Sequence, residues 1–257
     1  MKIAVFQFAS TDNISHNFSA MERAVLQASA HGVRVLVFHE CALCGYPPVE
    51  TEMDKIDFEL LNASIVKLQQ LAIAHDLYIA FGTIRKDGGK LYNATQLLAP
   101  SGEILGHYDK RALWGWDLDH FSKGNSLGIF EIDGVKIGFR ICFEVRFPEY
   151  FRELFRGNAE LCFVSFCDVS ESEDMGRYEI IKAHLRTRAV ENVMTVVSVN
   201  SISNYQTAPT AVFDINGTMR KEAPRNEEHL LLYDHTTPEI GWAAEGRIQN
   251  ARDAMNL

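Results

Sequence analysis

The sequence lacks any long hydrophobic run. Nowhere in its 257 residues do the roughly 18 consecutive apolar residues occur that a helix needs to cross a bilayer. The short apolar start, MKIAVFQFAS, is not followed by the small-residue cleavage pattern of a secretion signal, and it is more typical of a first strand. These absences predict a cytoplasmic protein with no membrane partner.

Basic clusters are also absent. Lys and Arg total 25 against 34 Asp and Glu, which gives a formal net charge of −9. Nucleic acids and anionic lipids bind through clustered positive charge, so neither is an expected partner. Cysteines number five, and an odd count in a long chain is typical of free thiols in a reducing compartment rather than of a disulfide framework.

Repeats, low-complexity stretches and linkers are absent too, and short apolar runs alternate with helical patterns along the whole chain. With 47% hydrophobic residues, the chain can bury a large core. This alternation predicts one α/β domain over residues 1–257. The segments 91–107 and 129–141 resemble hairpins, so the sheet is expected to be mixed. Helices are predicted at 15–31, 52–75, 148–156 and 177–191, strands at 2–8 and 77–83, and buried strands at 33–38, 161–166 and 193–199.

Three segments each place a reactive side chain at the end of a predicted strand. Glu40 follows VRVLVF, Lys110 follows a short strand before two tryptophans, and Cys142 ends VKIGFRIC. Ligands of α/β proteins bind at the carboxyl ends of strands, so chemistry is expected there. Each residue alone also has an ordinary interpretation: a strand-end carboxylate in water, a surface lysine over aromatic rings, or an inert buried thiol.

The three segments together carry a resemblance. They read HECALCGYPP, YDKRALW and CFEVRFPE, with 70 residues from Glu40 to Lys110 and 32 from Lys110 to Cys142. In order and spacing they resemble the nitrilase superfamily of carbon–nitrogen hydrolases, as does the stretch RTRAVENVMTVVSVNS at 186–201. The resemblance covers nearly the whole chain. It implies a four-layer αββα sandwich with mixed sheets, assembled as a homodimer or a larger oligomer.

The chemistry of amide cleavage supports the same three residues. A free thiol has a pKa of about 8.5 and is mostly protonated at neutral pH. Glu40 can take its proton as general base, and Lys110 can favour the thiolate. Lys110 and the backbone N–H of Phe143 can stabilise the oxyanion. Glu40 can then protonate the departing ammonia and activate water against the thioester, so no metal or cofactor is needed.

Some positions depart from the pattern of the family. His39 stands where proline is common, and Ala112 stands where histidine is frequent. The family often has a further Glu that supports the lysine. Here Asp119, followed by His120, is the predicted candidate for that role.

Substrate-binding residues are predicted around the same segments. The guanidinium of Arg146 can hold a carboxylate through two hydrogen bonds, and the RFPE motif resembles the branch that hydrolyses monoamides of dicarboxylic acids. The alternative is a structural ion pair of Arg146 with Glu144 or Glu149. Glu144 is therefore either a partner of this arginine or part of the site. The other predicted substrate-binding residues are Tyr46 and Trp114.

Four functions stay open at this point. The leading one is an amidase that releases ammonia and a carboxylate from a small amide through a cysteine thioester. An N-carbamoyl amidohydrolase and a nitrilase would use the same residues, and the fourth is a catalytically inactive binding protein. A zinc site at Cys41 and Cys44 is not favoured, because a zinc site would need a second closely spaced pair. The segment 241–257 shows no chemistry and is a candidate interface arm.

Overall fold

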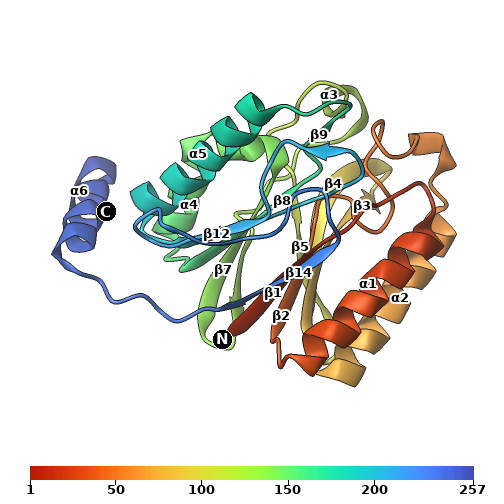
Figure 1. Ribbon diagram of the computed structural model, residues 1–257, viewed down its shortest axis with the longest axis horizontal. Coiled ribbons are helices and arrows are strands. Elements are labelled where there is room, and N and C mark those ends of the chain that lie inside the picture. The colour runs from red at the N-terminus through yellow and green to blue at the C-terminus, as the bar shows by residue number, and fades with distance from the viewer.

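The computed structural model describes all 257 residues and contains two six-stranded sheets packed face to face (Figure 1). The first sheet has the strand order β14-β1-β2-β3-β4-β5 and the second β13-β12-β10-β8-β7-β6. The strands of the first sheet are β1 (Lys2–Gln7), β2 (Val35–Phe38), β3 (Tyr78–Asp87), β4 (Lys90–Leu98), β5 (Ile104–Asp109) and β14 (His229–Asp234). Those of the second are β6 (Ile129–Ile132), β7 (Val135–Ile141), β8 (Leu161–Phe166), β10 (Thr195–Asn200), β12 (Ala211–Phe213) and β13 (Met219–Glu222). A small pair consists of β9 (Val169–Ser170) and β11 (Tyr205–Gln206).

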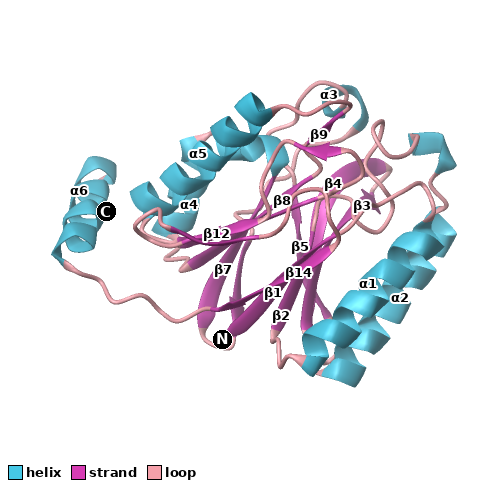
Figure 2. Cartoon of the chain, viewed as in Figure 1, coloured by secondary structure: helices cyan, strands magenta, loops and turns pink.

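Both sheets are mixed, as predicted. β1, β2 and β3 run parallel, as do β7, β8 and β10, while the outer strands of both sheets pair antiparallel. Helices cover the two outer faces (Figure 2). The α-helices are α1 (Ile14–Ala30), α2 (Phe58–His75), α3 (Asp117–His120), α4 (Pro148–Arg156), α5 (Met175–Asn192) and α6 (Trp242–Met255), and the short 3₁₀ helices are η1 (Met53–Lys55) and η2 (Cys142–Arg146). The predicted four-layer αββα sandwich is confirmed, with α1 and α2 on one side and α4 and α5 on the other.

Local sequence signals set the helix boundaries. Asn13 caps α1 by accepting the N–H of His16, and Asp57 caps α2 by accepting the N–H groups of Glu59 and Leu60. Each such cap contributes about 1 kcal/mol. The cap at Asp57 explains why the helix expected from residue 52 begins at Phe58, after a separate 3₁₀ turn.

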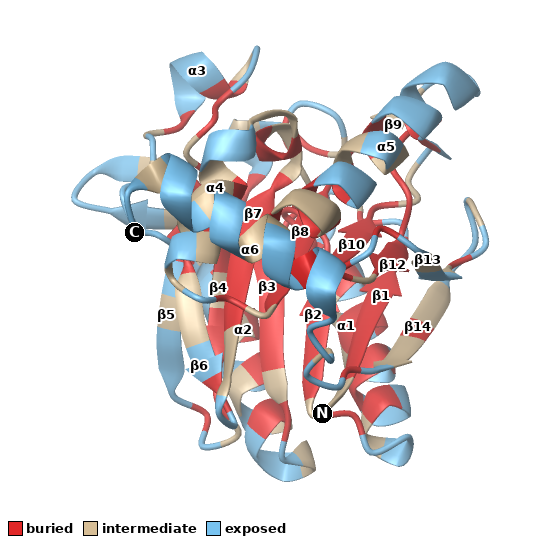
Figure 3. Cartoon of the chain, turned by 90° about the vertical axis from the view of Figure 1, so that its left-hand side faces the viewer, coloured by how far each residue is buried: buried red, intermediate tan, exposed pale blue.

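The core between the sheets fixes the strands that carry the reactive residues. Side chains from both sheets meet there, such as Val5 and Val37 from the first sheet and Phe139, Phe163 and Val197 from the second. Figure 3 shows the central strands buried beneath the helices and loops. Strands buried on both faces read as continuous apolar runs, which is why they were recognisable in the sequence.

The C-terminal helix α6 was not predicted. Figure 1 shows it at the end of an extended segment, outside the α4–α5 layer. Of its residues only Ala244 is buried, against Val193 and Ile215, and the side chain of Arg247 donates a hydrogen bond to the Ile215 carbonyl at 3.1 Å. Because α6 buries so few apolar side chains, its sequence shows no clear helical periodicity. Its role as an interface arm stays a prediction. None of the helices combines the length and apolar character required to span a membrane.

Candidate active site

The structure brings Glu40, Lys110 and Cys142 together at one end of the sandwich. Lys110 Nζ lies 2.8 Å from Glu40 Oε1, and both side chains are almost fully buried. Cys142 and Lys110 line one cavity of about 370 Å³. β2 and β5 run in the same direction within the first sheet, so Glu40 and Lys110 emerge at the same edge.

Glu40 is held by donors on both of its carboxylate oxygens. Oε1 accepts from Lys110 and, at 2.7 Å, from the side chain of Asn93, while Oε2 accepts the backbone N–H of Cys167 at 2.9 Å. Burial raises the pKa of Glu40 above its usual value, although Lys110 opposes the shift. A carboxylate with a raised pKa is a stronger base than an exposed one, which suits proton transfer from a thiol.

Lys110 is paired with a second acid, and that acid is Asp117. Lys110 Nζ lies 2.7 Å from Asp117 Oδ2, and the hydroxyl of Tyr46 donates to Asp117 Oδ1 at 2.7 Å. Asp119 is exposed and does not contact the lysine, so its predicted supporting role was wrong. Two residues along a helix differ in direction by about 200°, so Asp117 faces inward in α3 and Asp119 faces outward.

The environment keeps Lys110 charged. Burial by itself lowers the pKa of this lysine, but the nearby Glu40, Cys142, Tyr46 and Asp117 outweigh burial and hold the pKa well above its usual value. A permanently charged ammonium beside the thiol can stabilise negative charge on sulfur or on a substrate oxygen.

Cys142 joins β7 to η2 in a strained backbone conformation. Its φ is +47°, in the left-handed region, which costs about 1–2 kcal/mol for a residue other than glycine. Burial and the charge of Glu40 raise the pKa of its thiol well above the usual value, while Lys110 lowers it. The resting group is therefore a thiol, which needs a base to become a nucleophile. The first N–H groups of a helix lack partners within that helix, and the oxyanion role of the Phe143 N–H stays a prediction.

Glu144 is a positioning residue rather than a substrate ligand. Its fully buried carboxylate accepts the backbone N–H of Ile141 and of Arg111, each at 2.7 Å, and the hydroxyl of Tyr108 at 2.8 Å. It does not line the cavity, so its predicted substrate-binding role was wrong. The residue instead ties the strand end before Cys142 to the segment after Lys110.

The other predicted binding residues do line the cavity. Trp114 is largely exposed at the rim, with its ring centroid 6.1 Å from that of Phe143. Tyr46 presents its ring, because its hydroxyl is bound to Asp117. Arg146 pairs with neither Glu144 nor Glu149, and its guanidinium lies 5.9 Å from the Phe143 ring. The structural ion pair considered for Arg146 is thus absent.

The thiols of Cys41 and Cys44 are buried and make hydrogen bonds within the protein. Cys44 Sγ donates to the backbone carbonyl of Cys41, and Cys41 Sγ donates to the side-chain oxygen of Asn93 at 3.7 Å. The structure contains no group of three or more His, Cys, Asp or Glu side chains arranged to hold a metal ion.

We expect Asp117→Asn to lower kcat for an amide by about 10- to 100-fold, because the change weakens a charge-assisted hydrogen bond that holds Lys110. The matched control is Asp119→Asn, because the side chain of Asp119 is exposed. This change should leave kcat unaltered and shift the unfolding free energy by no more than about 0.5 kcal/mol. Steady-state ammonia release and chemical denaturation measure both effects. Equal losses in the two variants would contradict this assignment of the second acid.

The fold and the site together define a class of enzyme, in which a buried carboxylate and a buried ammonium flank a cysteine at the strand ends of a four-layer sandwich. The chain belongs to the carbon-nitrogen hydrolase family, whose sequence model matches residues 2–243. The predicted family membership is confirmed, and the protein is a hydrolase of carbon–nitrogen bonds.

Individual relatives agree with this family. The chain is 30% identical over 206 residues to a "Hydrolase in pqqF 5'region" of Pseudomonas protegens, covering 78% of this chain and 69% of that protein. It is 29% identical over 189 residues to a 2-oxoglutaramate amidase of Bacillus subtilis, covering 72% and 70%. Among solved structures, the amidase NitN of Nesterenkonia sp. AN1 shares the fold, with a TM-score of 0.83, 22% identity and coverage of 100% of this chain and 98% of that one.

Proposed function

We propose that this hydrolase is an amidase acting on small amides that carry a carboxylate, such as the monoamides of dicarboxylic acids. One observation carries the proposal. Of the charged side chains that line the cavity, Lys110 pairs with Asp117, Asp168 pairs with Arg177, and Arg146 alone makes neither an ion pair nor a hydrogen bond. An unpaired guanidinium in a cavity is suited to a carboxylate, which it binds through two parallel hydrogen bonds.

The size of the cavity and the relatives support a small substrate. A volume of about 370 Å³ lies at the lower end of the range for ligand pockets. The relative named 2-oxoglutaramate amidase acts, by its name, on an amide that also bears a carboxylate. Homo-oligomeric assembly and a cytoplasmic location stay predictions beside this proposal.

The proposed mechanism uses Glu40, Lys110 and Cys142, which the fold brings to one end of the sandwich. Glu40 removes the proton from Cys142 Sγ, and the thiolate attacks the amide carbonyl carbon. Lys110 Nζ and the Phe143 N–H stabilise the resulting oxyanion. Glu40 returns the proton to the nitrogen as the C–N bond breaks and ammonia leaves. Water, deprotonated by Glu40, then hydrolyses the thioester and regenerates the thiol and the free carboxylate.

Replacing Arg146 by Gln tests the carboxylate. We expect kcat/KM for the monoamides of four- and five-carbon dicarboxylates to fall by about 10- to 100-fold, mainly through KM, since a charged hydrogen bond contributes roughly 1.5–3 kcal/mol. A neutral amide of similar length should be cleaved equally well by both enzymes. The measurement is ammonia release over a panel that also contains carbamoyl compounds and nitriles.

The outcomes of this panel separate the candidate functions. An equal loss on acidic and neutral amides would contradict the role given to Arg146. Preferential turnover of carbamoyl compounds or nitriles by the unaltered enzyme would replace the amidase proposal with one of those activities.

A further inference from the structure

Asp168 is a buried acid in the cavity that the mechanism does not use. It lies two residues beyond the end of β8, and its side chain is 4% exposed. Both backbone groups of Asp168 are hydrogen-bonded. Its N–H donates to the side-chain oxygen of Asn200 at 2.9 Å. Its carbonyl accepts from the side-chain NH₂ of Asn200 at 2.8 Å and from the Thr207 N–H at 2.9 Å. The position of this carboxylate is therefore fixed before a ligand arrives.

The two oxygens of this carboxylate have different surroundings. Oδ1 accepts the hydroxyl of Thr207 and forms an ion pair with Arg177 Nη2 at 2.8 Å. Oδ2 accepts no hydrogen bond within the protein. It is not completely shielded from solvent, so a ligand can reach it. Asp168 lines the cavity, so Oδ2 is the carboxylate oxygen that remains for a ligand in that cavity. A carboxylate oxygen in so enclosed a place is stabilised when a ligand supplies a donor.

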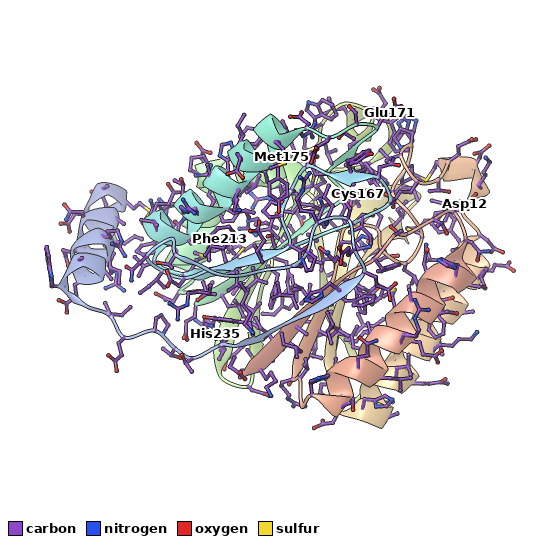
Figure 4. All side chains as sticks on the ribbon, viewed as in Figure 1. Asp12, Cys167, Glu171, Met175, Phe213 and His235 are labelled. Atoms are coloured by element: carbon purple, nitrogen blue, oxygen red, sulfur yellow. The ribbon has the colours of Figure 1, made fainter.

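Asp168 lines the same cavity as the nucleophile Cys142. Figure 4 places Cys167, the residue before Asp168, in the upper part of the sandwich. Cys167 itself donates its N–H to Glu40. After burial and Glu40, Asp168 is a further cause that raises the pKa of the Cys142 thiol, so its negative charge acts at the nucleophile.

We propose that Asp168 is a specificity-determining residue, whose Oδ2 accepts a hydrogen bond from an N–H donor of the substrate beside the scissile carbonyl. Thr207 and Arg177 hold the carboxylate through Oδ1 and leave Oδ2 for the ligand. The inference rests on the proposed function in that the substrate occupies this cavity. Two sources share this chemistry: the NH₂ of the scissile amide and an amino substituent on the neighbouring carbon.

Asp168→Asn is a specific test because the neighbouring donors determine how the amide group of the new Asn side chain is oriented. The donors Thr207 and Arg177 hold the side-chain oxygen of Asn at the Oδ1 position, so the NH₂ group replaces Oδ2. A donor then faces the donor of the substrate. Thr207→Val and Arg177→Gln are the matched controls, since each removes a partner of Oδ1 and leaves Oδ2 in place.

The experiment measures binding rather than turnover. In the Cys142→Ala enzyme, ligand-observed NMR gives the Kd of a dicarboxylate monoamide and of its methyl ketone, in which CH₃ replaces NH₂ and no donor remains. We expect the amide to bind about 10-fold or more tightly than the ketone. Adding Asp168→Asn should abolish this preference while the ketone keeps its affinity, which also shows that the pocket is intact. Adding either control substitution should preserve the preference.

A third ligand distinguishes the two sources. This ligand is a monoamide with an amino substituent on the carbon next to the scissile carbonyl. If the donor is that amino group, the unaltered site binds this ligand more tightly than the unsubstituted monoamide, and Asp168→Asn removes the difference. The proposal is overturned if Asp168→Asn removes neither preference, or if the control variants lose the same preference, which would leave Asp168 as an anchor for Arg177. Ammonia release by the unaltered enzyme tests the proposed function separately, so the two failures are distinguishable.

Discussion

Ammonia release from an acidic monoamide is expected to fall by at least about 10⁴-fold when Cys142 is replaced by Ala. The methyl group that remains cannot attack the carbonyl, and Glu40 then has no thiol proton to remove. Binding should persist, because Arg146 and the walls of the cavity are unchanged. The measurement is ammonia production at enzyme concentrations high enough to detect the residual rate.

The control for this variant is Cys162→Ala. Cys162 is a buried thiol in the core cluster on the helix side of the second sheet, and it does not line the cavity. This variant should retain its kcat and lose only packing, at a cost of about 1 kcal/mol. Substantial turnover by Cys142→Ala, or an equal loss in both variants, would contradict the assignment of the nucleophile.

Replacing Lys110 by Met is expected to impair both catalysis and stability. Without the ammonium, two fully buried carboxylates, Glu40 and Asp117, lose the cation between them. Removing one partner from a buried ionic group typically costs about 3–5 kcal/mol of unfolding free energy. The loss of an oxyanion donor should lower kcat by a further factor of about 100 to 1000.

Denaturant unfolding and ammonia release check the two effects, with Lys123→Met as the control. Lys123 is exposed in the same connection, so its replacement should shift the unfolding free energy by no more than about 0.5 kcal/mol. The double variant Lys110→Met/Asp117→Asn should recover part of the lost stability, because one unpaired charge is removed. An unchanged unfolding free energy in Lys110→Met would show that this buried cation does not hold the site together.

The positions of Glu40 and Cys142 followed from the sequence because each comes after a strand with a strong apolar signal, whereas Lys110 follows a shorter, more polar strand. Once VLVF and VKIGFRI are recognised as buried strands, one in each sheet, Glu40 and Cys142 are expected close to their carboxyl ends. The layers of the fold followed in the same way from the alternation of helices and strands. The resemblance supplied the pairing of the two sheets.

The predictions for Asp119 and Glu144 were wrong because both residues lie in short helices, where the sequence does not show which way a side chain points. Asp117 and Asp119 differ by half a helical turn within the four-residue α3, and no periodicity in the sequence fixes its phase. Glu144 stands two residues after Cys142 in a 3₁₀ helix, so its side chain points about 240° away from that of the cysteine. Sequence proximity to the nucleophile therefore suggested a pocket position that the backbone does not allow.

Two functional positions were missed although the sequence carried a signal for them. Asn93 lies within β4 and Asp168 just after β8, both among apolar neighbours. Asn and Asp are depleted in strands, and buried polar groups need partners. A polar residue inside or directly after a buried strand therefore marks a candidate for the site, here a donor to Glu40 and the acceptor Asp168.

The central claim is that an acyl group passes through Cys142 during carbon–nitrogen cleavage. Acid-quenched turnover of a dicarboxylate monoamide, followed by peptide mass spectrometry, tests it most directly. We predict a mass increase equal to the substrate minus ammonia on the peptide that contains Cys142, and no such adduct in the Cys142→Ala enzyme. An acyl adduct on any other residue, or sustained ammonia release by Cys142→Ala, would contradict the account.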